Sequence, residues 1–189
     1  MVKIGLQGAK GSFSEEASNV FVKNHGLKEF QLKYLISSKN VLKSLENKEI
    51  DYGIIAMENA QGGVVIESVD ALAGYRCEII EMFHLQISQN LLVKPGIHIG
   101  QITEIHSHQQ ALKQCRNYLS EHFWTIPLIE TDDTAEAARR LSENKLPKTA
   151  GVIGSKFCSD LYGLNILEEK IHDLKNNLTL FLGLKTLGH

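Results

Sequence analysis

The sequence predicts an α/β protein built from two small lobes. Strand-like and helix-like segments alternate along all 189 residues, a pattern typical of mainly parallel sheets covered by helices. The apolar run Tyr52–Met57 indicates a strand buried on both faces. A strand-like stretch from Glu78 to Val93 is longer than most strands, and we interpret it as a crossing between lobes. We therefore expect lobe one to hold residues 1–80 and 175–189, and lobe two residues 81–174.

The periodicity and turn residues place the individual elements. We expect strands over residues 2–7, 30–36, 52–57, 78–93, 102–106, 125–130, 149–154 and 178–184. We expect helices over residues 12–24, 37–48, 65–72, 107–123, 133–141 and 156–162. Capping-box spacing begins the helices at Ser12 and Ser107, Asp133 is the expected N-cap of a third, and Gly163 is an expected left-handed C-cap.

Composition excludes several classes of function. The net charge is −2, with no basic stripe of the kind that binds nucleic acid, and no apolar run approaches the ~18 residues of a membrane span. The three cysteines, Cys77, Cys115 and Cys158, show no C-x-x-C spacing, and the eight histidines show no metal-ligand spacing. We therefore expect reduced thiols, a cytoplasmic location without a signal peptide, and no bound metal.

Three polar segments follow predicted strands, where ligands of α/β sheets bind. Gly8–Ser12 is a turn entering a helix, which either binds an anion through backbone N–H groups or serves the turn alone. Glu58 and Asn59 either orient a polar ligand or form a salt bridge and an Asx-turn. Ser107 begins a helix and is more typical of an N-cap than of a nucleophile.

Taken together and in order, these segments resemble the prephenate dehydratase family over essentially the whole chain. Residues 4–17 look like its G-P-x-G-T-F-S opening, and Glu58-Asn59 with Gly63 and Glu67 is similar to its E-N-S-x-x-G-S-V-x-E segment. Residues 107–115 resemble S-H-P-Q-A-L-x-Q-C, and residues 134–138 match T-A-x-A-A. Residues 162–181 resemble Y-G-L … D … N-x-T-R-F.

The resemblance implies a fold and a reaction. The fold is two α/β lobes with the site in a cleft, an arrangement like that of periplasmic binding proteins. The reaction converts prephenate to phenylpyruvate, carbon dioxide and water in phenylalanine biosynthesis, without a cofactor. Thr179 is implied as the catalytic residue that assists departure of the ring hydroxyl. The implied substrate-binding residues are Ser12, Glu58, Asn59, Gly63, Ser107, His108, Gln110, Asn177 and Phe181. A homodimer is also implied.

Four positions depart from the family pattern. The Arg of T-R-F is Leu180, and a leucine cannot make the bidentate carboxylate bonds of an arginine. Ala60 and Val64 stand where the family has serines, and Gln89 stands where it commonly has a histidine. These changes leave two alternatives to the dehydratase: a prephenate decarboxylase that does not form the aromatic ring, and a small-molecule binding module derived from an enzyme.

Two further expectations follow from the resemblance. Arogenate is an alternative substrate to prephenate. The sequence ends at His189, without the regulatory amino-acid-binding domain that usually follows, so we expect no feedback control by phenylalanine through such a domain.

Overall fold

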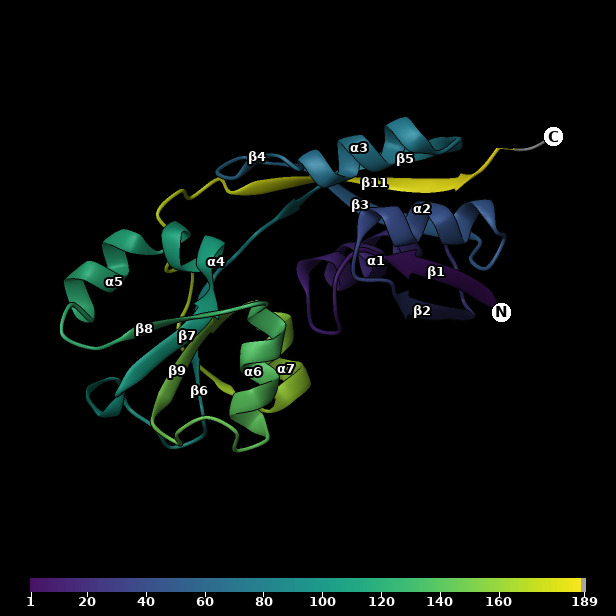
Figure 1. Ribbon diagram of the computed structural model, residues 1–189. Coiled ribbons are helices and arrows are strands. Elements are labelled where there is room, and N and C mark those ends of the chain that lie inside the picture. The colour runs from purple at the N-terminus through teal and green to yellow at the C-terminus, as the bar shows by residue number, and fades with distance from the viewer. Residues whose placement is uncertain (188–189) are drawn as a thin grey trace. The chain divides into compact units, whose positions relative to one another are not determined.

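The computed structural model describes residues 1–187, and the chain in it forms two compact α/β units (Figure 1). The first unit holds Met1–Gln86 and the C-terminal segment that begins at Asn177, and the second holds Ile87–Asn176. The first boundary therefore falls after residue 86 and not 80, and the second after residue 176 and not 174. The reason is that the strand ending at Gln86 pairs along its whole length within the first sheet.

The first unit is a six-stranded sheet in the order β2-β1-β3-β11-β5, with β4 paired to β3. Its strands are β1 (Val2–Leu6), β2 (Phe30–Tyr34), β3 (Tyr52–Asn59), β4 (Gly63–Val64), β5 (Cys77–Gln86) and β11 (Leu178–Thr186). Its helices are α1 (Phe13–Asn24), α2 (Ser38–Glu46) and α3 (Ile66–Gly74). Strands β1, β2 and β3 run parallel, whereas β11 is antiparallel to both β3 and β5.

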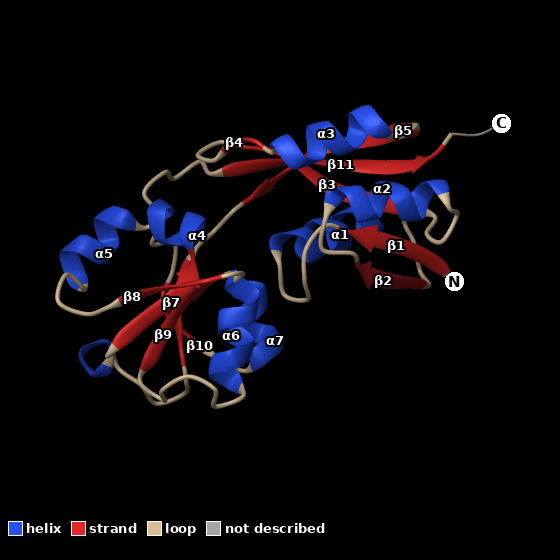
Figure 2. Ribbon diagram, in the orientation of Figure 1, coloured by secondary structure: helices blue, strands red, loops and turns tan. Residues whose placement is uncertain are grey.

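The second unit is a five-stranded sheet in the order β10-β6-β9-β7-β8. Its strands are β6 (Asn90–Val93), β7 (Glu104–His108), β8 (Leu128–Thr131), β9 (Ala150–Gly154) and β10 (Asn165–Glu168). Its helices are α4 (Gln109–Gln114), α5 (Arg116–His122), α6 (Thr134–Ser142), α7 (Lys156–Tyr162) and the short 3₁₀ helix η1 (Ile99–Gln101). Figure 2 shows α4 with α5, and α6 with α7, gathered at this sheet.

Both sheets are mixed, so the expectation of mainly parallel sheets was wrong. Each sheet keeps a parallel set, β2-β1-β3 or β9-β7-β8, and adds antiparallel strands where the chain passes from one unit to the other. The stretch expected as one strand over 78–93 is two strands, β5 and β6, separated at residues 87–89 and belonging to different sheets. Periodicity did not reveal this break because the alternation of apolar and polar residues continues into it, through Leu85, Gln86, Ile87 and Ser88.

Two other elements have different bounds from those expected. Strand β2 stops at Tyr34 because Ile36 adopts a φ of 68°, and Ser37 N donates to Leu35 O at 2.7 Å across that tight turn. The helix expected over 107–123 is strand β7 as far as His108, followed by α4 and α5 with a break at Cys115. The short strands β4 and β10 were not predicted, since a two- or four-residue strand has too few residues to show a period.

Two predicted caps are confirmed. Asp133 accepts hydrogen bonds from Ala135 N at 2.6 Å and Glu136 N at 3.1 Å, which stabilises the start of α6. Gly163 ends α7 with a φ of 62°, a left-handed conformation that suits glycine. None of the described helices is both long and apolar enough to cross a membrane.

Packing on both faces of the first sheet depends on two glycines. A Cβ atom at Gly53 would lie 2.6 Å from Val41 Cγ1 of α2, so α2 packs directly against the backbone of β3. On the opposite face, a Cβ at Gly183 in β11 would lie 2.5 Å from Cε2 of Phe21 in α1. Phe21 is fully buried, so its ring has no exposed side toward which to move.

We therefore expect Gly183→Ala to lower the free energy of unfolding by about 1–3 kcal/mol through overpacking against Phe21. Urea denaturation measures this loss. The matched control is Gly74→Ala at the end of α3, where a Cβ meets no atom within 4 Å and alanine is the better helix former. Equal stability of the two variants would contradict this account of the packing.

Candidate functional site

Three polar side chains meet on the β3–β11 ladder of the first unit. The register places Thr179 opposite Asn59, although 120 residues separate them in the sequence. Asn59 Nδ2 lies 2.9 Å from Thr179 Oγ1 and 2.8 Å from Asn177 Oδ1. Asn177 is fully buried and Thr179 is 7% exposed. The structure therefore brings together three of the residues that the sequence assigned to one site.

The direction of these hydrogen bonds is fixed by the backbone. Asn59 Oδ1 accepts from Gln61 N at 3.1 Å and from Gly62 N at 2.8 Å, and backbone N–H groups can only donate. The amide nitrogen of Asn59 must therefore face Thr179 and Asn177, an orientation assigned from the hydrogen-bond network. Thr179 Oγ1 accepts from Asn59, which leaves the Thr179 hydroxyl hydrogen to be donated to another acceptor.

Two buried polar atoms of the first unit have no hydrogen-bond partner among the described residues. They are Asn177 Nδ2, on the residue that accepts from Asn59, and Ser12 Oγ, at the start of α1. Buried polar atoms in folded proteins are nearly always paired, and an unpaired one calls for an explanation such as a ligand or an ordered water. Both residues belong to the site set implied by the sequence.

The turn before α1 differs from the predicted capping box. Ser12 occupies the N-cap position, but its side chain makes no cap hydrogen bond. Glu15 instead accepts from Gly11 N at 2.7 Å through Oε2 and from Tyr34 Oη at 2.8 Å through Oε1. Gly8 has a φ of 119°, and a Cβ there would lie 2.8 Å from Ser12 Oγ. The glycine thus permits the chain to fold back over a serine whose hydroxyl is not used for capping.

The leucine that replaces the family arginine lies on the other side of the strand from Thr179. Leu180 stands opposite Glu58 of β3 and His84 of β5, whereas Thr179 stands opposite Asn59 and Leu85. Successive strand residues point to opposite faces. The side chains of Glu58, Leu180 and His84 therefore form a separate row, and the substitution leaves the hydrogen bond between Asn59 and Thr179 in place.

Gly63 and Phe181 have roles in the scaffold. Gly63 pairs with Asn59 across the β3–β4 turn and has a φ of 75°, which suits glycine. Phe181 is 1% exposed, and its ring stacks on Phe83 with centroids 6.0 Å apart. A ring buried this deeply packs the sheet, and the expectation that Phe181 lines a substrate site stays a prediction.

The predicted site residues of the second unit lie at the end of β7. Ser107 is fully buried within the strand, and its hydroxyl donates to Ile153 O at 2.9 Å, so it is not the predicted N-cap. His108 is the N-cap of α4 instead, with Nδ1 accepting from Gln110 N at 3.2 Å. That bond places the proton of a neutral imidazole on Nε2, which makes this exposed ring a hydrogen-bond donor.

A buried polar network in the same unit was not predicted. Gln89 is 4% exposed, its side-chain amide donates to Gln114 Oε1 at 3.0 Å, and its backbone N donates to His172 Nδ1 at 3.3 Å. Gln89 Oε1 has no partner among the described residues. Burial, and secondarily the charge of Lys175, lowers the pKa of His172. The network joins the two segments by which the chain enters and leaves this unit.

Two other kinds of chemistry receive no support from the described part of the chain. No group of three or more His, Cys, Asp or Glu side chains there could hold a metal ion. Burial, with a further contribution from Asp173, raises the pKa of the Cys115 thiol to about 12, so it is not a thiolate nucleophile at neutral pH.

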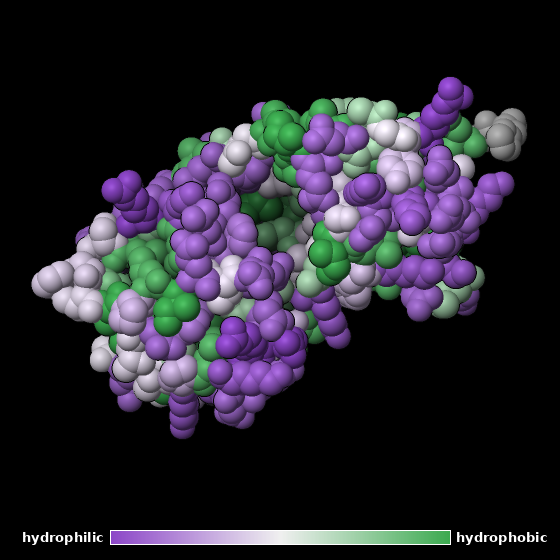
Figure 3. All heavy atoms as spheres, in the orientation of Figure 1, coloured by the Kyte–Doolittle hydropathy of each residue, from purple (hydrophilic) through white to green (hydrophobic). Residues whose placement is uncertain are grey.

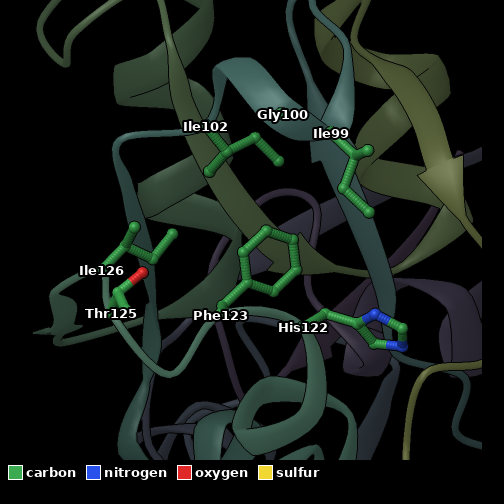
Figure 4. Close-up of a pocket in the computed structure, with 7 residues that line it drawn as sticks. All are labelled: Ile99, Gly100, Ile102, His122, Phe123, Thr125 and Ile126. Atoms are coloured by element: carbon green, nitrogen blue, oxygen red, sulfur yellow. The ribbon is translucent and has the colours of Figure 1, made fainter.

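A pocket of about 380 Å³ in the second unit is lined mainly by apolar side chains, including Ile99, Ile102, Phe123 and Ile126 (Figure 4). It lies at the amino ends of β7 and β8, because Ile102 and Ile126 both precede those strands. Ser107 and His108 lie at the opposite, carboxyl end of β7, so this pocket is separate from the predicted site residues.

The two α/β units give the chain a fold that is known from solved structures. The chain has the fold seen in a periplasmic substrate-binding protein of an ABC transporter from Coxiella burnetii, with a TM-score of 0.50 at 14% identity over 96% of this chain and 84% of that one. At that identity the likeness concerns the fold alone. Within this fold class the chain belongs to the prephenate dehydratase family, whose model matches residues 4–187.

Individual proteins to which the chain is similar carry the names of this family. The chain is 34% identical over 174 residues to a prephenate dehydratase of Methanocaldococcus jannaschii, covering 92% of this chain and 61% of that protein. It is 34% identical over 185 residues to arogenate dehydratase/prephenate dehydratase 1 of Arabidopsis thaliana, covering 96% of this chain and 44% of that protein. The solved prephenate dehydratase of Arthrobacter aurescens, in complex with L-Phe, superposes with a TM-score of 0.88 at 26% identity, covering all of this chain and 61% of that one. The chain thus spans less than two thirds of each of these family members.

The buried His172 predicts a pH dependence of stability. Since its pKa is lowered on folding, the unfolded chain binds more protons between the folded pKa and the usual value of 6.5. The free energy of unfolding should therefore fall as the pH drops below about 6.5. We expect His172→Gln to reduce this slope and His84→Gln, at an exposed residue of β5, to leave it unchanged. Urea denaturation at a series of pH values measures the slope; identical slopes for wild type and His172→Gln would refute the assignment.

Proposed function

We propose that this chain is a prephenate dehydratase, a carbon–oxygen lyase that forms phenylpyruvate, carbon dioxide and water from prephenate. The observation that carries the proposal is the Thr179 hydroxyl, whose oxygen accepts from Asn59 and whose hydrogen remains to be donated. Membership of the family and similarity to named dehydratases over most of the chain support it.

The reaction needs a hydrogen-bond donor at the oxygen of the departing ring hydroxyl. The bond between the ring and its carboxylate breaks to release carbon dioxide, and those electrons pass through the ring as the bond to the ring hydroxyl breaks. The departing oxygen takes up a proton and leaves as water, and the ring becomes aromatic. A hydrogen bond from Thr179 to that oxygen stabilises the negative charge that develops on it in the transition state. No redox cofactor is needed in this balance.

We assign the remaining residues to substrate binding and positioning. Asn59 orients the Thr179 hydroxyl, while Asn177 Nδ2 and Ser12 Oγ are the unpaired buried groups that suit a polar substrate. The remaining substrate-binding residues implied by the resemblance stay predictions: Glu58, Gly63, Ser107, His108 and Gln110. Of these, the Glu58 side chain lies in the row with Leu180, on the other face of the sheet from Thr179.

The altered T-R-F segment is compatible with this proposal. Because Leu180 points away from the face that carries Thr179, loss of the arginine removes a charge without removing the proposed donor. We therefore expect the chemistry at Thr179 to be retained.

Substrate, location and assembly are part of the same proposal. The name of the Arabidopsis relative includes arogenate, so arogenate is the alternative substrate, and both compounds belong in the assay. We propose a cytoplasmic enzyme on the basis of three free cysteines, of which Cys115 and Cys158 are buried. We propose a homodimer as its assembly.

The identity of the product tests the proposal. Purified protein is incubated with prephenate or arogenate at neutral pH, and products are identified by NMR against the spontaneous background. We expect catalysed formation of phenylpyruvate from prephenate. A decarboxylated product without an aromatic ring would assign the chain to the decarboxylases, and absence of turnover with saturable binding would make it a binding module.

We expect Thr179→Val to reduce kcat by about 10²–10³, the usual effect of removing one donor to a developing oxyanion, with little change in KM. The same substitution at Thr186, whose hydroxyl donates to Leu45 O at the other end of β11, is the matched control and should leave kcat unchanged. Steady-state kinetics of the two variants compare them directly. A Thr179→Val enzyme as fast as wild type would remove Thr179 from the mechanism.

A further inference from the structure

The first turn of α1 holds a buried carboxylate. Figure 3 shows hydrophilic side chains over α2 and β1 of the first unit, where charged groups meet water. Glu15 is instead only 6% exposed, although glutamate is rarely buried without partners. The cost of burying this side chain must therefore be offset by the contacts that it makes inside the fold.

Two hydrogen bonds offset the burial of Glu15. Its Oε2 accepts from Gly11 N at 2.7 Å, and its Oε1 accepts from Tyr34 Oη at 2.8 Å. Tyr34 is the last residue of β2 and stands opposite Leu6, the last residue of β1. The carboxylate therefore ties the turn before α1 to the ends of two parallel strands.

The bond to the backbone differs from that of a capping box. In a capping box, the glutamate at N3 accepts from the backbone N–H of the N-cap residue, and the N-cap serine accepts from the backbone N–H of N3. Here Ser12 N donates to Ala9 O at 3.2 Å, and Glu15 reaches one residue further back, to Gly11 N. The Ser12 side chain makes no cap bond in return. Glu15 thus holds the turn without engaging the serine hydroxyl.

The Ser12 hydroxyl is buried without a partner among the described residues. Backbone confines it on one side, since a Cβ at Gly8 would lie 2.8 Å from Ser12 Oγ and Gly8 N is itself bound to Ile36 O at 3.1 Å. A serine at an N-cap usually accepts from the N–H groups of the first turn. If the turn were free to relax, the hydroxyl would take up that role and be withdrawn from a ligand.

We propose that Glu15 is a positioning residue of the substrate site, which holds the backbone before α1 so that the Ser12 hydroxyl stays available to a carboxylate of the substrate. The inference rests on the proposed function, in which Ser12 binds prephenate. Ser12 donates its hydroxyl hydrogen to the carboxylate, and Glu15 does not touch the substrate. The positive end of the dipole of α1, a helix of 12 residues, favours the same anion.

A conservative substitution separates position from charge. In Glu15→Gln, Oε1 can accept from Gly11 N while Nε2 donates to Tyr34 Oη, so both contacts are kept and one negative charge is lost. Glu15→Ala loses both contacts. We expect KM for prephenate to rise about tenfold in Glu15→Ala, the usual effect of losing one hydrogen bond, with kcat changed by less than about twofold. In Glu15→Gln, KM should stay within about twofold of wild type. An equal rise in both variants would overturn the proposal.

Glu16→Ala is the matched control. Glu16 lies in the same first turn of α1, so this variant loses the same interaction of a carboxylate with the helix dipole and keeps the hydrogen bonds of Glu15. We expect its KM and kcat to be those of wild type. A rise in KM as large as that of Glu15→Ala would assign the effect to the dipole and overturn the role of Glu15.

Combination with Ser12→Ala tests whether Glu15 acts through that hydroxyl. If it does, Ser12→Ala has the same KM with or without Glu15→Ala, because no hydroxyl is left to position. The midpoint of urea denaturation should fall equally on Glu15→Ala in either background, since the bonds to Gly11 and Tyr34 do not involve the Ser12 side chain. A merely structural role would predict rises in KM that multiply, and that result would overturn the proposal.

The affinity for prephenate separates this inference from the proposed function. Isothermal titration calorimetry measures Kd for prephenate on the same variants. A wild-type chain that binds prephenate without turnover fails as a dehydratase, and Kd then replaces KM in each comparison. Wild-type turnover with KM and Kd unchanged by Glu15→Ala would retain the dehydratase and overturn the positioning role. A wild-type chain that neither binds nor converts prephenate would overturn both.

Discussion

The antiparallel pairing of β11 with β3 and β5 is the constraint on which the first unit depends. The chain leaves this unit at Gln86 and returns at Asn177. The returning strand, β11, lies between β3 and β5, which both precede Gln86 or end there in the sequence. Pairing over such a separation carries a loop-closure cost, which is recovered because β11 forms ladders along both of its edges. The same ladders bring Thr179 to Asn59, so the scaffold and the proposed chemistry depend on one set of backbone hydrogen bonds.

This arrangement places two residues that are adjacent in the sequence on opposite faces of the sheet. Thr179 and Leu180 are neighbours, yet one faces Asn59 and the other stands between Glu58 and His84. A change at residue 180 therefore alters the charge on one face of the sheet while the hydroxyl on the other face keeps its partner. The sequence motif alone does not show that these two side chains lie on different faces, and the strand register does.

Local features could be predicted from the sequence, and long-range ones could not. The Asp133 and Gly163 caps and the buried strand after Asp51 follow from a few neighbouring residues, and the structure has all three. For Asn59, the predicted turn is present, because its oxygen accepts from Gln61 N and Gly62 N, while its nitrogen contacts Thr179. By contrast, the pairing of Gln89 with His172 joins residues 83 positions apart, and no local pattern signals it. The same holds for Ser107, whose place in β7 is set by its bond to Ile153 O.

The central claim is that Asn59 acts by orienting the Thr179 hydroxyl, and a double-mutant cycle on kcat/KM for prephenate tests it most directly. Asn59→Asp keeps an oxygen for the turn and removes the donor to Thr179, while Thr179→Val removes the hydroxyl. If the two residues act as a unit, the double variant loses no more activity than Thr179→Val alone, because the orienting group has nothing left to orient. Losses that multiply in the double variant would show that the two residues act independently and would contradict the account.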